Sequence, residues 1–116
     1  MRGVLRGLHF QKEDYSQAKL ISVLKGGILD IVVDLRKDSK TFGKYFAMEI
    51  NENNKKMLFI PKGFAHGFLT LGDGTEIFYK CDSFYNPQSE GGIIWNDRDL
   101  NIDWNLKKYN IDENEL

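Results

Sequence analysis

The chain has 116 residues, of which 41% are hydrophobic and 28% charged, and its formal net charge is −1 at pH 7. This length predicts a single globular domain, and the near-neutral charge argues against broad binding to nucleic acids or anionic membranes. No apolar run is long enough to span a membrane and no cleavable leader is evident, so we expect a cytoplasmic protein. The single cysteine, Cys81, cannot form an internal disulfide, which fits a reducing compartment.

Short apolar runs separated by Gly, Asn, Asp and Pro predict a chain made of β-strands. In chain order, strands are expected at residues 4–10, 18–23, 28–35, 45–50, 56–60, 65–71 and 75–81, with a late strand near 92–95. No apolar stripe of helical period is sustained, so we expect little helix. Seven or eight strands in a chain of this length predict an antiparallel sandwich or barrel with an accessible mouth. Residues 105–116, taken alone, predict a solvated tail or a short edge segment.

The only two histidines both lie in predicted strands, and both are candidates for chemistry. Strand alternation puts His9 on the face opposite Arg6 and Leu8, so its side chain points into a polar cavity or to solvent. His66 lies among aromatic and small residues, so we expect it to be buried and to need a partner. Asp30, in an otherwise apolar strand, needs a partner too, and we predict a buried pair between His66 and Asp30. A purely structural role stays open for all three residues.

A metal site is not expected, because a cupin-type site needs a His-x-His pair with a downstream Glu and no second histidine lies near His9. Two histidines from separate strands could still recruit a carboxylate. Tyr79 could donate a proton opposite an imidazole base, although the chain's five tyrosines could equally be packing residues. Lys19 begins its predicted strand and is either a solvated strand end or a cation that stabilises an enolate.

Several motifs appear together in a fixed order: RGLHFQ, QAKL, LDIVVDLRKDSKTFGK, FIPKGFAHGF, EIFYK, GGIIWND and LNIDW. Over residues 4 to about 104 they resemble the dTDP-4-dehydrorhamnose 3,5-epimerase family of the cupin superfamily, and Pro61-x-Gly63-x-x-His66 resembles the second cupin motif. The resemblance implies an all-β, antiparallel jelly-roll (cupin-like) barrel with little helix. It implies one domain over residues 1–116, with a barrel core at 1–104 and a C-terminal tail at 105–116. It also implies a homodimer and no metal or organic cofactor.

The same resemblance implies a reaction, the cofactor-independent epimerisation of dTDP-4-dehydro-6-deoxy-D-glucose at C3 and C5 to dTDP-4-dehydro-L-rhamnose. This step belongs to the biosynthesis of dTDP-L-rhamnose and surface polysaccharide. A ketone acidifies both neighbouring C–H bonds, so one base, one cation and one acid on the opposite face can invert the two centres in turn. The implied roles are general base for His9, proton donor for Tyr79 and a second tyrosine of the site for Tyr85. Lys19 is implied both to stabilise the enolate and to contact the substrate, and the other implied substrate contacts are Arg6, His66 and Glu90.

Two other interpretations stay open. One is a C3-only epimerase or a 3,4-ketoisomerase of the same superfamily, although the RGLHF stretch fits the epimerases better than the ketoisomerases. The other is a shortened nucleotide-sugar-binding relative with little or no activity. Compared with the family, we expect the chain to lack an N-terminal segment with a strand exchanged across the dimer, and a C-terminal segment whose aspartate pairs with the base. Without that carboxylate we expect His9 to be a weaker base, and without that strand we expect unpaired backbone groups at an edge.

Overall fold

The fold is taken from a computed structural model, which describes residues 3–12, 17–82 and 87–116. All eight predicted strands are present, and each overlaps its expected range. They are β1 (Leu5–Gln11), β2 (Lys19–Lys25), β3 (Gly27–Asp34), β4 (Tyr45–Asn51), β5 (Met57–Ile60), β6 (Phe64–Thr70), β7 (Glu76–Cys81) and β8 (Glu90–Gly92). The helical elements of the described residues are the short 3-10 helices η2 (Pro87–Ser89) and η3 (Glu113–Glu115). None of the described helices is long and apolar enough to cross a membrane.

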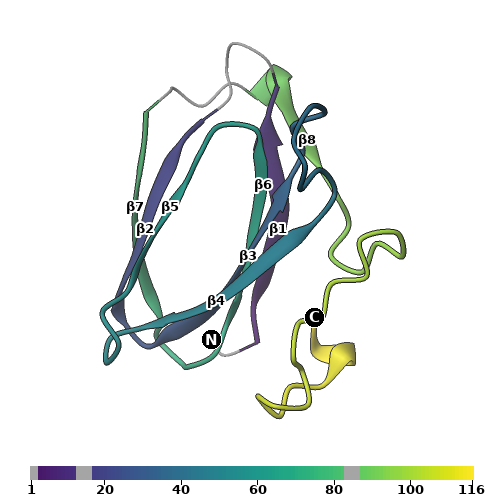
Figure 1. The fold of residues 1–116 in the computed structure, drawn as a ribbon. Helices are drawn as coiled ribbons and strands as arrows, with labels where there is room; N and C mark the ends of the chain where they lie inside the picture. The colour runs from purple at the N-terminus through teal and green to yellow at the C-terminus, as the bar shows by residue number, and fades with distance from the viewer. Residues whose placement is uncertain (1–2, 13–16, 83–86) are drawn as a thin grey trace.

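The strands form two antiparallel sheets that face each other (Figure 1). One sheet has five strands in the order β4-β3-β6-β1-β8, and the other has three in the order β5-β2-β7. The predicted antiparallel all-β fold is therefore confirmed. Because β1 lies next to β6, the N-terminal part of the chain meets its middle, and His9 pairs in register with His66.

β3 is the centre of the molecule, since all eight of its residues are buried. Its side chains alternate between two faces, and both faces are covered. Between the sheets lies one apolar cluster, made of Ile21, Val23, Ile28, Val32, Ile50 and Ile60. On the other face of the five-stranded sheet, Leu29, Ile31 and Val33 belong to a second cluster together with Trp104 and Ile111. The segment after β8 thus covers the outer face of this sheet.

Residues 105–116 are more than a solvated tail. Ile111 is buried in the second cluster, and Tyr109 packs against it. The Tyr109 hydroxyl donates a hydrogen bond to Glu49 Oε1 on β4, at 2.8 Å. Burial and then the neighbouring Glu49 raise the pKa of Tyr109 to about 12. The segment is therefore fixed to the sheet by apolar burial and by this hydrogen bond.

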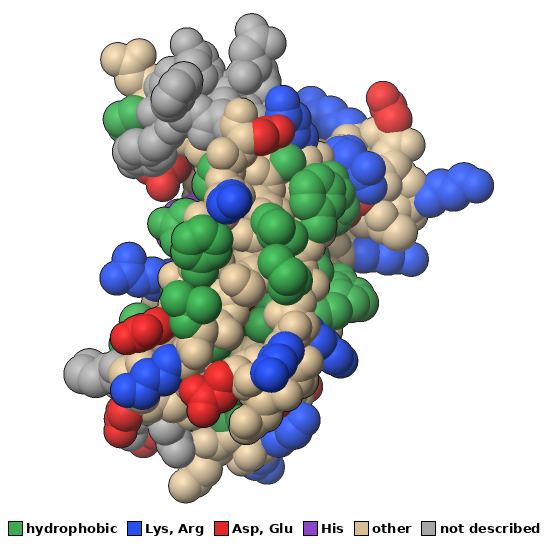
Figure 2. Space-filling view, turned by 90° about the vertical axis from the view of Figure 1, so that its left-hand side faces the viewer, with side chains coloured by type: hydrophobic (Ala, Val, Ile, Leu, Met, Phe, Trp, Pro, Cys, Tyr) green, Lys and Arg blue, Asp and Glu red, His purple; other side chains and the backbone are tan. Residues whose placement is uncertain are grey.

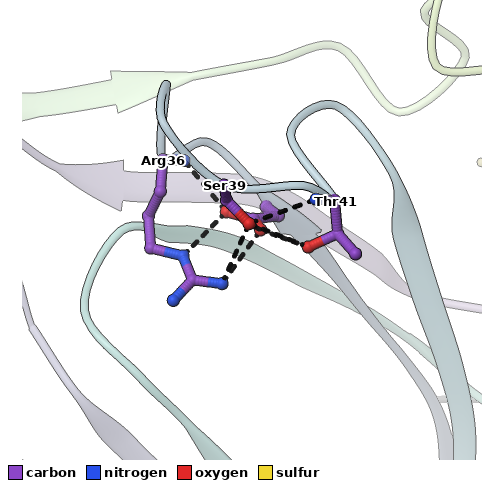
Figure 3. Close-up of polar contacts among 4 residues, drawn as sticks. Arg36, Ser39 and Thr41 are labelled. Carbon is purple, nitrogen blue, oxygen red and sulfur yellow. Dashed lines mark hydrogen bonds and ion pairs between the residues drawn. The ribbon is translucent and has the colours of Figure 1, made fainter.

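The loop after β3 is closed by the carboxylate of Asp34, which is only 2% exposed. Both of its oxygens accept hydrogen bonds: from the backbone N–H, Nε and Nη2 of Arg36 at 2.9, 3.0 and 3.0 Å, and from the hydroxyls of Ser39 and Thr41 at 2.6 and 2.5 Å (Figure 3). The Arg36 guanidinium, followed by the two hydroxyls, holds the pKa of Asp34 well below its usual range. The backbone N–H of Leu35 also donates to Gly63 O, at 2.9 Å, so this loop fixes the end of β3 beside the start of β6.

Candidate active site

A cavity of about 300 Å³ opens between the two sheets. Its walls come from β1 and β6 on one side and from β2 and β7 on the other. The lining residues are Arg6, His9, Lys19, Ile21, His66, Gly67, Phe68, Ile77 and Tyr79. Five of the residues predicted for a site, namely Arg6, His9, Lys19, His66 and Tyr79, therefore surround one space, although they are distributed over more than half of the chain.

The β1 wall depends on an irregularity that strict alternation does not predict. The pairing of β1 with β6 shifts register between Arg6 and His9. Gly7, at φ +129°, lies inside this shift, and a Cβ added to it would be only 2.5 Å from the Cα of Gly67. Two glycines thus let the strands approach closely, and Arg6 lines the same cavity as His9. The expectation that these two side chains lie on opposite faces is wrong, because the irregularity reverses the side on which Arg6 points.

The opposite wall carries a cation and a phenol. On β2 and β7, Ile21 pairs with Tyr79 and Lys19 pairs with Cys81, so these four side chains share the inner face of the three-stranded sheet. Tyr79 is 60% exposed, which leaves its hydroxyl accessible from the mouth of the cavity. Ile77, two residues earlier on the same face, adds apolar surface beside it. This wall can therefore present both charge and apolar contact to a ligand.

The floor of the cavity holds the predicted buried pair. His66 Nε2 lies 2.7 Å from Asp30 Oδ2, and Asp30 is completely buried, which confirms the pairing. The other carboxylate oxygen, Oδ1, has no hydrogen-bond partner among the described residues. Burial raises the pKa of Asp30, while the hydrogen bond and charge of His66 and the charge of Lys19 act in the opposite direction. The floor thus contains a carboxylate that is only partly satisfied, in contact with one cavity-lining side chain and close to the charge of another.

His9 stands at the mouth, with a half-exposed side chain. Its Nδ1 lies 3.7 Å from Oε1 of Glu90, within ion-pair range but too far for a hydrogen bond. A second cavity of about 250 Å³ adjoins here and shares His9, Lys19 and Tyr79 with the first, while Glu90 also lines it. Sequence reasoning placed Glu90 at the substrate but missed its position beside His9. This contact results from the pairing of β1 with β8, in which Gln11 lies opposite Glu90. No sequence motif predicts this pairing.

Some sequence-based expectations fall elsewhere. Tyr85 lies outside the described residues. Within the part of the chain that the structure describes, no three His, Cys, Asp or Glu side chains cluster as a metal site would require. Phe68 lines the floor beside His66 and was not singled out, although it lies two residues further along the same strand.

The chain matches the family model described as dTDP-4-dehydrorhamnose 3,5-epimerase over residues 1–115. It is 44% identical to the dTDP-4-dehydrorhamnose 3,5-epimerase of Shigella flexneri, over 99% of this chain and 64% of that protein. The crystal structure of such an epimerase from Elizabethkingia anophelis NUHP1 superposes with a TM-score of 0.88 at 51% identity, covering 95% of this chain and 60% of that one.

A third relative was solved with a ligand. The dTDP-6-deoxy-D-glucose-3,5-epimerase from Legionella pneumophila Philadelphia 1, in complex with dTDP-4-keto-L-rhamnose, gives a TM-score of 0.85 at 46% identity, covering 90% of this chain and 55% of that one. The chain thus spans about three fifths of the length of these relatives.

Proposed function

The chain belongs to the dTDP-4-dehydrorhamnose 3,5-epimerase family, and from this premise we propose that it epimerises dTDP-4-dehydro-6-deoxy-D-glucose at C3 and C5 without a cofactor. The product is dTDP-4-dehydro-L-rhamnose, the sugar nucleotide that the Legionella relative holds. One observation carries the proposal: His9 and Tyr79 line the same cavity from opposite sheets. Inversion of a carbon centre requires a base on one side of the sugar and an acid on the other, and this geometry supplies both.

His9 acts as the base. The C–H bond next to the C4 ketone breaks, its proton passes to the imidazole, and the electron pair forms an enolate whose charge rests on O4. Nδ1 lies toward the Glu90 carboxylate, so Nε2 is the nitrogen left to face the substrate. Glu90 is thus proposed both to contact the substrate and to support His9.

Lys19 and Tyr79 complete the reaction from the opposite wall. Lys19 lines the cavity, where a lower dielectric than that of water strengthens the attraction of its ammonium for an enolate oxygen. The Tyr79 hydroxyl then gives its proton to the carbon from the face opposite His9, which inverts the centre. The imidazolium of His9 then releases its proton to water and the phenolate of Tyr79 takes one up, which restores the base and the acid. The same cycle at the second carbon gives the doubly inverted sugar, with no change of oxidation state. Tyr85, outside the described residues, is proposed as a second tyrosine of this site.

Arg6 and His66 bind and orient the substrate. The guanidinium of Arg6 lines the cavity and suits a diphosphate, because its planar fork of donors matches phosphate oxygens. Asp30 occupies Nε2 of His66, which fixes the ring and leaves Nδ1 for a substrate atom. Asp30 is therefore an orienting residue, retained in the core although burial opposes its charge. We place the protein in the cytoplasm, as a homodimer, on the route to dTDP-L-rhamnose and surface polysaccharide, with one domain whose barrel core is 1–104 and whose tail is 105–116.

Proton exchange in heavy water tests the proposal. The purified chain is incubated with dTDP-4-dehydro-6-deoxy-D-glucose, and deuterium at C3 and C5 is read by NMR. Incorporation at both carbons is expected, and a His9→Asn variant should abolish it while dTDP still binds. Incorporation at C3 alone would make the protein a C3-epimerase. Binding of dTDP without any exchange would make it a nucleotide-sugar-binding module and refute the enzymatic assignment.

A further inference from the structure

Lys19, proposed to stabilise the enolate, is the first residue of β2. It pairs in register with Ile60 of β5 and with Cys81 of β7, and it lines both cavities of the site. Strand ends open more readily than strand centres, because fewer hydrogen bonds hold them. How well the Lys19 side chain keeps its place in the cavity therefore depends on how the end of β2 is fixed to its neighbours.

The end of β2 is closed by Asp82, the residue that follows β7. In a regular antiparallel ladder, two facing residues can exchange two backbone hydrogen bonds. Here the Asp82 N–H donates one such bond to Ala18 O, at 3.2 Å, but the Ala18 N–H donates to the side-chain Oδ1 of Asp82, at 2.9 Å. A carboxylate oxygen is a stronger acceptor than a neutral carbonyl. The ladder thus ends on a charge-assisted bond, one residue before Lys19.

The same carboxylate also reaches the other side of β2. Asp82 Oδ2 lies 3.8 Å from Nζ of Lys62, in the turn between β5 and β6. Because β2 lies between β5 and β7, the Asp82 side chain spans the end of β2 from one neighbouring strand to the turn after the other (Figure 1). Both members of this ion pair are about half exposed, so its attraction is weak and the hydrogen bond to Ala18 is the stronger contact.

Asp82 does not line either cavity, although its neighbour Cys81 lines the second one. Figure 2 looks onto the outer side of the three-stranded sheet, where hydrophobic side chains run along the middle and charged side chains lie mostly around them. Asp82 belongs to the end of this sheet rather than to the cavity. The contact through which it can affect the reaction is therefore its bond to the β2 backbone.

We propose that Asp82 is a positioning residue for Lys19, because its carboxylate closes the end of β2 and so fixes the lysine that faces the enolate oxygen. This inference rests on the proposed function, in which Lys19 stabilises the enolate. Such stabilisation requires a charge that is in place before the enolate forms, and displacement of a catalytic group by about 1 Å can cost about a hundredfold in rate. Loss of the bond to Ala18 would leave the residue before Lys19 with one fewer contact to β7 and the lysine less well placed.

Three variants of the full chain test this role, each assayed for turnover of dTDP-4-dehydro-6-deoxy-D-glucose and for dTDP binding by calorimetry. Asp82→Ala removes the acceptor and should lower kcat about fivefold, while dTDP binding stays within about twofold of wild type. Asp82→Asn keeps an acceptor oxygen for the Ala18 N–H and should hold kcat within about twofold of wild type. The control is Asp103→Ala, at an exposed aspartate that accepts a bond from the Asn105 N–H, at 2.8 Å, and lines neither cavity. Its kcat should not change.

A double variant separates the positioning of Lys19 from a general loosening of the fold. If Asp82 acts through Lys19, Asp82→Ala should slow the wild-type enzyme but not the Lys19→Ala enzyme, whereas general loosening would slow both alike. Hydrogen–deuterium exchange, read by mass spectrometry on a peptide that covers residues 17–21, gives a second measurement that does not depend on activity. Exchange should be faster in Asp82→Ala than in wild type and unchanged in Asp82→Asn.

Three results would overturn the proposal and leave the epimerase assignment standing. They are equal kcat values for Asp82→Ala and wild type, a loss of kcat that Asp82→Asn shares, and a further slowing of the Lys19→Ala enzyme by Asp82→Ala. A wild-type chain without turnover would refute the epimerase assignment and, with it, this role of Asp82. Faster exchange in Asp82→Ala would then be a structural effect alone.

Discussion

Two aspartates of β3, Asp30 and Asp34, give the most direct test of how buried charges affect stability. Both side chains are buried, but Asp34 accepts many hydrogen bonds and Asp30 few. Asp34 accepts five hydrogen bonds from the loop that follows it. Asp30 has one partner, His66, and one oxygen with none among the described residues. Replacing each by asparagine keeps the shape and removes the charge. We therefore expect the asparagine variant of Asp34 to lose more stability than the asparagine variant of Asp30, because Asp34 accepts more hydrogen bonds.

The expected change in the free energy of unfolding follows from the groups that hydrogen-bond each carboxylate. Asp34→Asn turns one acceptor oxygen into an N–H₂ group that faces donors, so several charge-assisted bonds are lost and unfolding should become easier by about 3 kcal/mol at neutral pH. The partners Arg36 and Thr41 are exposed and can turn to water, which keeps the loss from being larger. In Asp30→Asn the amide still accepts from His66, and the cost of burying a charge disappears. We expect a change within about 1 kcal/mol at neutral pH.

The pH dependence should also have opposite signs. The lowered pKa of Asp34 stabilises the fold above the usual aspartate value of about 3.9 and ceases to do so as the pH falls toward the folded value, so the Asp34→Asn deficit is full at neutral pH and shrinks in acid. The raised pKa of Asp30 favours the fold in acid, and that contribution is lost as the pH rises through its folded value. The Asp30→Asn variant should therefore improve relative to wild type as the pH rises.

Urea denaturation at several pH values, with the exposed Asp38→Asn as a matched control, measures these differences. The control should be nearly neutral. The reasoning is refuted if Asp30→Asn loses as much stability as Asp34→Asn at neutral pH, or if both variants change in the same direction with pH. Either result would mean that burying the Asp30 charge does not lower the free energy of unfolding. Retaining a buried charge at this position would then not oppose stability, as the orienting role proposed for Asp30 assumes.

Three further predictions concern other parts of the molecule. Gly7→Ala should cost about 3 kcal/mol or prevent folding, because its Cβ meets the Gly67 backbone, whereas Gly43→Ala, at φ +78° with open space around it, should cost about 1 kcal/mol by thermal unfolding. Tyr109→Phe should lose about 1 kcal/mol. Because the pKa of Tyr109 is raised to about 12, this hydrogen bond stabilises the wild type up to about pH 10 and is lost above it, so denaturation at alkaline pH should bring the two proteins together. Lys19→Ala should lower turnover about a hundredfold and leave dTDP binding by calorimetry nearly unchanged; a loss of affinity alone would argue against enolate stabilisation.

The strands and the buried pair could be predicted because their causes are local. A two-residue period with turn residues at its ends identifies strands wherever they lie. Asp30 and His66 could be paired because each is a polar side chain in apolar surroundings and needs a partner. Neither inference requires knowledge of which strands are neighbours.

What sequence reasoning missed depends on strand order and register. The contact of His9 with Glu90 exists because β8 pairs with β1, and these two strands are separated by more than half of the chain. Arg6 lines the cavity because the pairing of β1 with β6 shifts register, and two closely approaching glycines permit this shift. The alternation of side chains along a strand does not predict such a shift. The burial of Ile111 likewise depends on a segment folding back over the outer side of the five-stranded sheet. Such long-range pairings are properties of the whole fold.

The central claim is that His9 and Tyr79 act on the sugar from opposite walls of the cavity, and a comparison of exchange with inversion tests it most directly. Wild type, His9→Asn and Tyr79→Phe are each incubated with dTDP-4-dehydro-6-deoxy-D-glucose in heavy water, and deuterium uptake and product are measured separately by NMR. Tyr79→Phe should still exchange protons through His9 while forming little inverted product, and His9→Asn should do neither. Inversion at the wild-type rate without Tyr79, or exchange that persists without His9, would contradict the account.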